Sequence, residues 1–286
     1  MLTHKEKRLI REYLGPHPIY VLKNLKSMTN NNLLIKVDGL KYVLRRPGKG
    51  TTDLVSRENE YTAYNAIKDL DISDELVFFD KDSGLKLTHY IEDARTCDQN
   101  NLYDVYLCMQ KLKSLHNMQI KVDKVFDLYA MIDKYESLMG KSEYPDYVDT
   151  KLRVEKLKLY LPKTQDDFCL THIDPNQDNF LIGRDLRVQL IDWEYAAMQD
   201  PHVDIAMFAI YAGYNEDQIK RLIEIYFGEK KKKKIMCQIY SYIAICGLLW
   251  SNWCEYKKKC GIDFGDYAKS QYEYARKFSR CAEWNM

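Results

Sequence analysis

The sequence predicts an α+β protein in which a small sheet-rich part is followed by a larger helical part. Up to about residue 91, two pairs of short apolar runs each flank a turn signal, and one helical segment lies between the pairs. After that point most apolar residues recur at helical spacing. The chain has 286 residues, 46% of them hydrophobic, so it can bury the core of one large or two modest domains.

The first part is expected to contain two hairpins with a helix between them. Its four strand-like runs are residues 32–36, 41–45, 76–80 and 85–90. Asp38-Gly39 joins the first two runs and Asp82-Ser83-Gly84 joins the last two, and both favour tight turns. Residues 54–70 have one apolar face at helical spacing. Residues 1–14 lack the apolar core of a signal peptide and are predicted to form an amphipathic helix instead.

The second part is expected to be helical around one short extended island. The helical segments are 102–116, 125–139, 149–161, 201–214, 216–227, 235–256 and 267–284, and the island comprises 168–171, 179–182 and 188–191. The longest apolar stretch, 239–253, is interrupted by polar residues and is shorter than the ~20 residues of a membrane span. It is therefore predicted to be a buried helix, and no membrane span is expected.

Composition excludes several classes of protein. A formal net charge of +1 argues against a dedicated nucleic-acid-binding protein. The run Lys230 to Lys234 is expected to be a solvated turn or helix end. Eight cysteines occur without any C-x-x-C pattern, and six histidines are not grouped around them, which excludes most zinc-site spacings. Such cysteines are typical of reduced thiols in a cytoplasmic protein. The oligomeric state is left open.

Residues 171–195 carry the strongest chemical signal, because Asp174, Asn179 and Asp192 each stand next to a short apolar run. Phosphoryl transfer needs a carboxylate that accepts the proton of the attacking hydroxyl late in the reaction. It also needs Mg²⁺, which prefers hard oxygen ligands such as carboxylates and amide carbonyls. Asp174 fits the first role, and the other two residues fit the second.

An alternative is that these residues only cap turns, which is the usual role of Asp and Asn in loops. Three of them at these intervals, each beside an apolar anchor, favour a site over three unrelated caps. Asp178 could also bind a metal, but it falls outside the expected spacing. His172 is interpreted as an orienting residue bonded to the backbone rather than as a participant in the chemistry.

The segment 172–179, followed by Ile191-Asp192-Trp193-Glu194, resembles the H-x-D-x-x-x-x-N and I-D-x-E motifs of the choline/ethanolamine kinase and aminoglycoside phosphotransferase superfamily. These enzymes share the protein-kinase fold. Where protein kinases carry D-F-G, this sequence has Asp192-Trp193-Glu194, which favours the small-molecule branch. Asp204 matches a further aspartate of the family and is expected to support the catalytic loop rather than to contact substrate.

The resemblance implies a bilobal, protein-kinase-like fold with a small sheet-rich N-lobe. Residues 1–91 would form the nucleotide-binding lobe, and residues 92–286 the helical lobe with the catalytic loop and the acceptor pocket. It also implies that Asp174 is the catalytic base and that Asn179 and Asp192 bind Mg²⁺, with ATP as the phosphoryl donor.

A polar turn between the first strands binds phosphate in this family, and residues 25–32 resemble it. There, Ser27 and Asn30 could bond phosphate oxygens, although a plain surface turn is the alternative. The sequence has no G-x-G-x-x-G and no Walker A motif. Tyr90 and Ile91 lie where the hinge that contacts adenine is expected.

Arg45 resembles the phosphate-binding cation on the strand before the first helix of the nucleotide lobe. Arginine suits this role because its planar fork matches phosphate oxygens. Glu60 is its expected ion-pair partner, with Glu58 as the alternative.

Trp250 and Trp253 carry the signal for the acceptor. They are three residues apart and would share a helix face, and they resemble the W-x-x-W helix of choline kinases, whose rings surround the trimethylammonium group. Each ring face contributes on the order of 1 kcal/mol to binding such a cation. Core packing of the two rings is the alternative. Further acceptor-site candidates are Glu194, Tyr195, Tyr211 and Tyr274.

The leading hypothesis is therefore ATP-dependent phosphorylation of choline, with the sequence around Arg45 and Asp204 resembling the bacterial LicA-type choline kinases. An ethanolamine kinase, or another amino-alcohol or antibiotic kinase, is the rival. Eukaryotic choline kinases carry a Glu near the position of Tyr211, so an acidic contribution to choline binding is in doubt. A non-catalytic binding module would be expected to lack Asp174 or a metal ligand, and all three residues are present.

Overall fold

The computed structural model describes residues 1–25, 30–48, 56–162, 164–228 and 233–284. Their contacts divide the chain into two compact units. The first unit consists of Met1–Thr96 and Phe180–Tyr195, and the second consists of Cys97–Asn179 and Ala196–Met286. The expected lobe boundary after residue 91 stays a prediction.

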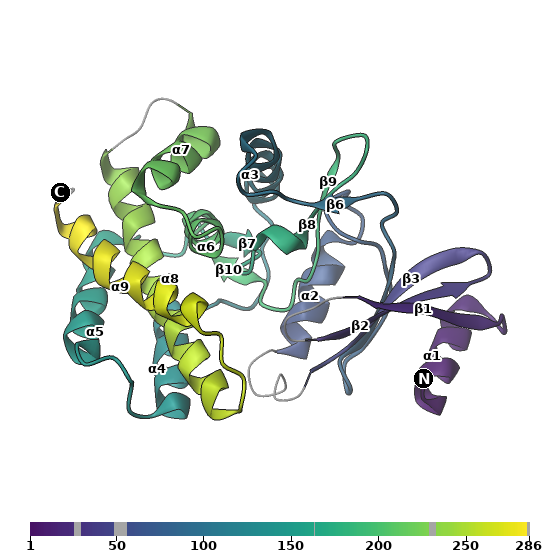
Figure 1. The fold of residues 1–286 in the computed structure, drawn as a ribbon. Helices are drawn as coiled ribbons and strands as arrows, with labels where there is room; N and C mark the ends of the chain where they lie inside the picture. The colour runs from purple at the N-terminus through teal and green to yellow at the C-terminus, as the bar shows by residue number, and fades with distance from the viewer. Residues whose placement is uncertain (26–29, 49–55, 163, 229–232, 285–286) are drawn as a thin grey trace. The chain divides into compact units, whose positions relative to one another are not determined.

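The first unit contains a five-stranded antiparallel sheet in the order β1-β2-β3-β5-β4 (Figure 1). Its strands are β1 Ile19–Leu25, β2 Asn31–Val37, β3 Leu40–Arg46, β4 Leu76–Asp80 and β5 Leu85–His89. Both predicted hairpins are confirmed. Asp38 and Gly39 have φ values of 47° and 82°, as a tight hairpin turn requires. β1 was not predicted, because it is an edge strand whose five central residues are exposed and show no alternation.

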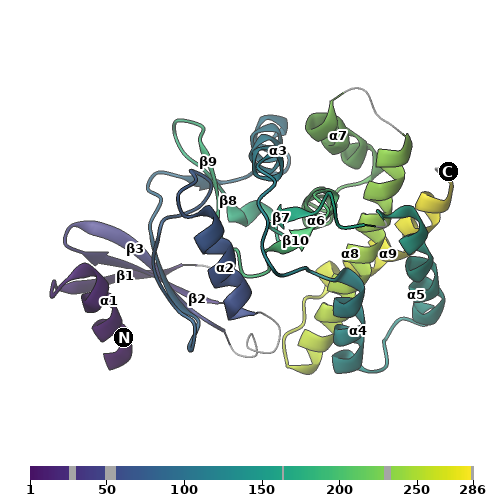
Figure 2. The ribbon, with the colours of Figure 1, turned by 180° about the vertical axis from the view of Figure 1, so that it is seen from behind.

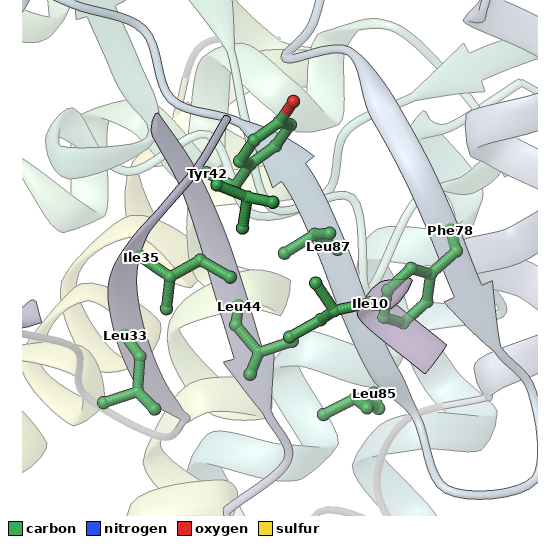
Figure 3. Packing of buried hydrophobic residues seen from close by; sticks show 9 residues of the cluster. Ile10, Leu33, Ile35, Tyr42, Leu44, Phe78, Leu85 and Leu87 are labelled. Carbon is green, nitrogen blue, oxygen red and sulfur yellow. The ribbon is translucent and has the colours of Figure 1, made fainter. Parts of the chain in front are cut away.

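Two helices belong to this sheet: α1 (His4–Leu14) and α2 (Arg57–Ile67). Thr3 and Glu6 form a capping box that begins α1, as predicted for an amphipathic helix. Ile10 of α1 inserts among apolar side chains from four strands (Figure 3). The buried cluster consists of Ile10, Leu33, Ile35, Val37, Tyr42, Leu44, Phe78, Leu85 and Leu87.

A second, small sheet of the first unit carries the predicted metal-ligand segment. It consists of β6 (Arg95–Thr96), β8 (Phe180–Ile182) and β9 (Val188–Leu190), in the order β6-β8-β9. Phe180 pairs with Leu190 across the β8–β9 hairpin. The chain enters this hairpin from Asn179 and leaves it towards Asp192.

The second unit is mainly helical, as predicted. Its helices are α3 Leu102–Asn117, α4 Leu128–Met139, α5 Tyr147–Lys156, α6 His202–Tyr211, α7 Glu216–Phe227, α8 Lys233–Lys259 and α9 Asp266–Trp284. Its short elements are the 3₁₀ helices η1 Leu157–Tyr160 and η2 Gln177–Asn179, and the paired strands β7 Cys169–Thr171 and β10 Ala197–Gln199. Helix α4 begins three residues later than predicted, because Asp127 accepts hydrogen bonds from the backbone of its first turn.

Helix α8 is the centre of the second unit. Helices α9 and α4 both pack against it, and α8 and α9 lie side by side in both views (Figures 1 and 2). In the described part of the chain α8 is the one helix long and apolar enough to cross a membrane, but 89% of its most apolar window is buried in the protein. The predicted buried helix is therefore confirmed.

Candidate active site

The catalytic loop follows β7 in the second unit, and the fully buried Asp204 lies against it. Asp204 Oδ2 accepts the backbone N–H of His172 at 2.9 Å, and Oδ1 accepts that of Ile173 at 2.8 Å. Ile173 has φ 67°, a left-handed conformation that is unusual for a β-branched residue. Such a conformation persists only where neighbouring bonds fix it. These contacts are the geometry expected of a residue that supports the loop.

His116 was missed by the sequence interpretation, although it completes this cluster. Its Nε2 lies 2.9 Å from Asp204 Oδ2, and its Nδ1 lies 2.7 Å from the hydroxyl of Tyr226. Burial, followed by the nearby Asp204, raises the pKa of Tyr226 above its ordinary value, so the hydroxyl keeps its proton. A lone histidine 88 residues before Asp204 gave no spacing signal.

Asp174 and Asn179 are brought together by the turn between them. Asn179 Nδ2 donates to the backbone oxygen of Asp174 at 2.8 Å and to its Oδ2 at 3.2 Å. Asn176 Nδ2 donates to the same carboxylate oxygen at 3.3 Å. Because its amide nitrogen is used in this way, Asn179 directs its carbonyl oxygen elsewhere, and no hydrogen bond among the described residues engages that oxygen. Carbonyl oxygens of this kind suit Mg²⁺.

In the first unit, the predicted ion pair between Arg45 and Glu60 is present and buried. Arg45 Nη2 lies 2.6 Å from Glu60 Oε2. The alternative partner, Glu58, lies instead 3.0 Å from Lys81 on the exposed side of the helix.

Arg45 also contacts the segment that follows β9. Its Nη1 lies 3.0 Å from Asp192 and 3.5 Å from Glu194. Burial would lower the pKa of Arg45, but the attraction of Glu60, Asp192 and Glu194 outweighs it and raises the pKa further above the ordinary value. The guanidinium is therefore permanently charged and joins β3 to both carboxyl groups.

Glu194 is the more deeply buried of the two carboxyl groups that Arg45 contacts in this segment. Burial, followed by repulsion from Asp192, raises the pKa of Glu194 to about 8, against an opposing attraction from Arg45. Asn30, predicted to contact phosphate, donates to Glu194 Oε2 at 3.2 Å and accepts from the backbone of Gly48 at 3.4 Å. The sequence placed Glu194 in the acceptor site, whereas the described contacts join it to Arg45 and Asn30.

Lys86 on β5 is a second buried cation that sequence reasoning missed. It pairs with Arg45 across the β3–β5 register, so both side chains point to the face covered by α2. Its Nζ lies 3.0 Å from Glu60 Oε1, 2.8 Å from the Tyr64 hydroxyl and 4.0 Å from Asp192. Lys86 stands between two leucines of a hairpin strand. A solvent-exposed lysine on the outer face of a strand would produce the same alternation, so the sequence contains no sign that Lys86 is buried.

The other predicted nucleotide contacts stay predictions. Tyr90 and Ile91 follow β5 and are half-buried. The Tyr90 backbone N–H donates to the backbone carbonyl oxygen of Lys41 at 3.0 Å. Ser27 lies outside the described residues.

A row of aromatic rings crosses the second unit. Neighbouring ring centroids lie 6.0 Å apart for Tyr211 and Trp250, 5.6 Å for Trp250 and Trp253, 4.9 Å for Trp253 and Phe264, and 6.2 Å for Phe264 and Tyr267. The two tryptophans meet edge to face, at an interplanar angle of 88°. Lys257 Nζ lies 5.5 Å from the centroid of Trp253, so one ring of the row already faces a cation.

The charge of the predicted base acts on the last ring of the row. Burial, then Cys254 and Asp174, raise the pKa of Tyr267 well above its ordinary value. Phe264 and Tyr267 were not predicted, because they flank the start of α9 and have no helical spacing relative to the tryptophans. The hydroxyl of Tyr274 donates to the backbone carbonyl oxygen of Tyr214 at 2.7 Å, and the predicted place of Tyr274 in an acceptor site stays a prediction.

Tyr195 closes the first unit and is half-buried. Its predicted place in an acceptor site stays a prediction.

The oxygen donors fit a magnesium ion better than a zinc ion. The described residues contain no group of three or more His, Cys, Asp or Glu that could bind a metal among themselves. Mg²⁺ typically takes one or two protein oxygens and completes its shell with phosphates and water. Of the predicted ligands, Asn179 in the second unit offers a carbonyl oxygen and Asp192 in the first unit offers a partly exposed carboxylate. Their binding of one metal ion stays a prediction.

Comparison with known proteins identifies the family. The model of the choline/ethanolamine kinase family matches residues 23–225. A Protein LicA of Haemophilus influenzae is 31% identical over 283 residues, covering 93% of this chain and 81% of the relative. The crystal structure of choline kinase LicA from Streptococcus pneumoniae has a TM-score of 0.82 at 29% identity, covering 98% of this chain and 100% of that chain.

Two further structures extend the likeness. LicA in complex with AMP has a TM-score of 0.81 at 29% identity, covering 98% of this chain and 100% of that one. An aminoglycoside phosphotransferase with 14% identity and a TM-score of 0.69 covers 96% of this chain and 97% of its own, and shares the fold alone. The predicted kinase-like fold is confirmed, and the protein is a nucleotide-binding phosphotransferase that acts on a small alcohol. The chain belongs to the choline/ethanolamine kinase family.

Proposed function

We propose that this enzyme transfers the γ-phosphoryl group of ATP to the hydroxyl of choline, giving phosphocholine and ADP. The observation that carries the proposal is the row of aromatic rings from Tyr211 to Tyr267. The LicA choline kinase of known structure, at a TM-score of 0.82, supports the same choice of acceptor.

Aromatic rings suit choline because its trimethylammonium group is charged and cannot donate hydrogen bonds. Ring faces attract such a cation by about 0.5–2 kcal/mol each, most strongly where water is excluded. Lys257 already lies over Trp253. We therefore assign the main binding role to Trp250 and Tyr211.

Asp174 would act as the base. Asn176 and Asn179 donate to its carboxylate and fix its direction. As the choline oxygen bonds to the γ-phosphorus, the bond to the bridging oxygen breaks and ADP leaves. The hydroxyl proton passes to the Asp174 carboxylate late in this displacement.

Asn179 and Asp192 would bind Mg²⁺, which when bound neutralises the charge on the phosphate oxygens. Arg45 stays charged at any pH at which the protein is folded, and its Nη1 lies 3.0 Å from Asp192. It can therefore orient the Asp192 carboxylate and face the nucleotide phosphates. The free thiols of the eight cysteines support a reducing, cytoplasmic location.

The test is a coupled ADP-release assay with the purified chain on choline, ethanolamine, thiamine and a panel of aminoglycosides. Choline should have the highest kcat/KM, and Asp174→Asn should lower kcat by about 10²–10⁴-fold while the enzyme still binds ATP. Preferred turnover of ethanolamine would replace choline as the acceptor. Undiminished turnover by Asp174→Asn would refute the assigned base.

A further inference from the structure

A partly buried hydrogen-bond path lies outside every motif of the first unit and leads to the residue beside Asp192. It connects the cation Lys86 on β5 to the indole of Trp193 through Tyr64 on α2 and two residues of the loop between α2 and β4. The path consists of Lys86, Tyr64, Asp74, Ser73 and Trp193.

The donors and acceptors of this path agree at every step. Lys86 donates to the Tyr64 hydroxyl at 2.8 Å, and Tyr64 donates to Asp74 Oδ1 at 3.1 Å. From the other side, Trp193 Nε1 donates to the Ser73 hydroxyl at 2.9 Å, and Ser73 donates to the same Asp74 oxygen at 2.8 Å. Burial and the carboxylates around it raise the pKa of Tyr64 well above its ordinary value, so this hydroxyl always has a proton to donate.

The path closes into a ring through the ion pairs already described. Lys86 and Arg45 each contact one oxygen of Glu60, at 3.0 and 2.6 Å. Arg45 contacts Asp192, and Asp192 is covalently bonded to Trp193. This closed ring of contacts therefore connects to the Asp192 side chain through Arg45 and to the Asp192 backbone through Trp193.

Close packing alone does not explain the conformation of the loop between α2 and β4. An open pocket of about 280 Å³ is lined by Ser73 and Asp74 among others, so these two side chains are only partly covered by the protein. Asp192 itself has φ 64°, a conformation that costs a non-glycine residue free energy unless its surroundings fix it. Trp193 is fully buried and also donates to the Leu190 carbonyl at 2.8 Å.

We propose that Tyr64, Asp74 and Ser73 are positioning residues that, through Lys86 and Trp193, orient the Asp192 carboxylate for the nucleotide–metal site. The inference rests on the proposed role of Asp192 as a magnesium ligand. Residues outside the ligand shell that orient a ligand commonly change metal affinity or activity by about 10–100-fold when they are replaced.

The sharpest variant is Tyr64→Phe, which keeps the ring and its packing and removes only the hydroxyl that joins Lys86 to Asp74. The matched control is Tyr61→Phe on the same helix, since no hydrogen bond among the described residues engages the Tyr61 hydroxyl. Both variants are prepared as the full chain with 5-fluorotryptophan, and Trp193→Phe assigns the fluorine resonance of Trp193.

Tyr64→Phe should shift or broaden the Trp193 resonance and raise the Mg²⁺ concentration for half-maximal turnover by about tenfold. The KM for the acceptor alcohol should stay within about twofold, and Tyr61→Phe should match the parent in every measurement. Ser73→Ala added to Tyr64→Phe should have little further effect, because both interrupt one path.

The proposed positioning role would be refuted if Tyr64→Phe changed neither the Trp193 resonance nor the magnesium dependence. It would also be refuted if Tyr61→Phe changed them as Tyr64→Phe is expected to. Full additivity of the effects of Tyr64→Phe and Ser73→Ala would refute it as well. The fluorine spectrum needs no turnover. If choline is not phosphorylated by the parent, the proposed function fails while the ring is still tested by the spectrum.

Discussion

Replacing Asp204 with asparagine should both destabilise the second unit and slow catalysis. The carboxylate accepts the backbone N–H groups of His172 and Ile173, and His116 Nε2 lies 2.9 Å from it, in a fully buried place. An amide has one acceptor oxygen, so in either orientation one buried backbone N–H of the loop would face an N–H group.

The size of the effect follows from these bonds. A buried donor left without its partner costs about 1–3 kcal/mol, and the remaining bonds lose the strength that a charged acceptor gives them. Asp204→Asn should therefore lower the free energy of unfolding by about 3 kcal/mol, a large part of the 5–15 kcal/mol that is usual for a domain. Ile173 would relax from its left-handed conformation and move the adjacent Asp174, and a misplacement of about 1 Å can lower kcat by about 10².

Urea unfolding followed by circular dichroism measures the first effect, and saturating-substrate kinetics measures the second. Asp217→Asn is the control, because Asp217 is 89% exposed at the start of α7. A loss of stability below about 0.5 kcal/mol, the range of an ordinary surface substitution, together with an unchanged kcat, would refute the reasoning about Asp204.

Three further outcomes are expected. Trp250→Ala should raise the KM for choline by about tenfold and the KM for ATP by less than about twofold, and Trp250→Phe should have an intermediate effect on the KM for choline. Equal increases in both KM values would mean that the Trp250 ring is purely structural. The pKa of Glu194 is about 8 in the folded protein against an ordinary 4.5, so the folded state holds a proton that the unfolded state has lost, and stability should fall as pH rises through this interval. Thermal melts from pH 5 to 9 should show a smaller decline for Glu194→Gln, and parallel curves would contradict the shift. Gly247→Ala would place a Cβ 2.7 Å from the Gln271 carbonyl of α9, and should cost about 1–3 kcal/mol in urea unfolding; an unaffected midpoint would mean that the two helices can separate at no cost.

Local patterns were enough to predict most of the fold. Asp38-Gly39 and the run from Asp82 to Gly84 specify their hairpins through residues that accept unusual backbone angles. The periodic segments became helices with shifts of a few residues at their ends, since capping by residues such as Asp127 decides where a helix begins. Strand β1 was missed because an exposed edge strand has no buried face to produce alternation.

The candidate site was only partly visible in the sequence. Asp174, Asn179 and Asp192 lie within 19 residues of one another and keep a recognisable spacing. Lys86 and the loop containing Asp74 carry no such spacing, because they meet Asp192 or its neighbour Trp193 only after strands and helices far apart in the chain have paired.

The same arrangement occurs in both units, which explains why motifs are easier to predict than their supports. In each unit a non-glycine residue has a left-handed φ at or beside a predicted site residue: Ile173 at 67°, next to Asp174, and Asp192 itself at 64°. Each is contacted by a buried group from a distant element: Asp204 on α6 accepts the Ile173 backbone N–H, and Arg45 on β3 lies 3.0 Å from the Asp192 carboxylate. A strained backbone of this kind costs of order 1–3 kcal/mol, so the motif residues alone would relax into an ordinary loop. The chemistry is therefore encoded locally, whereas the geometry that makes it possible depends on tertiary contacts.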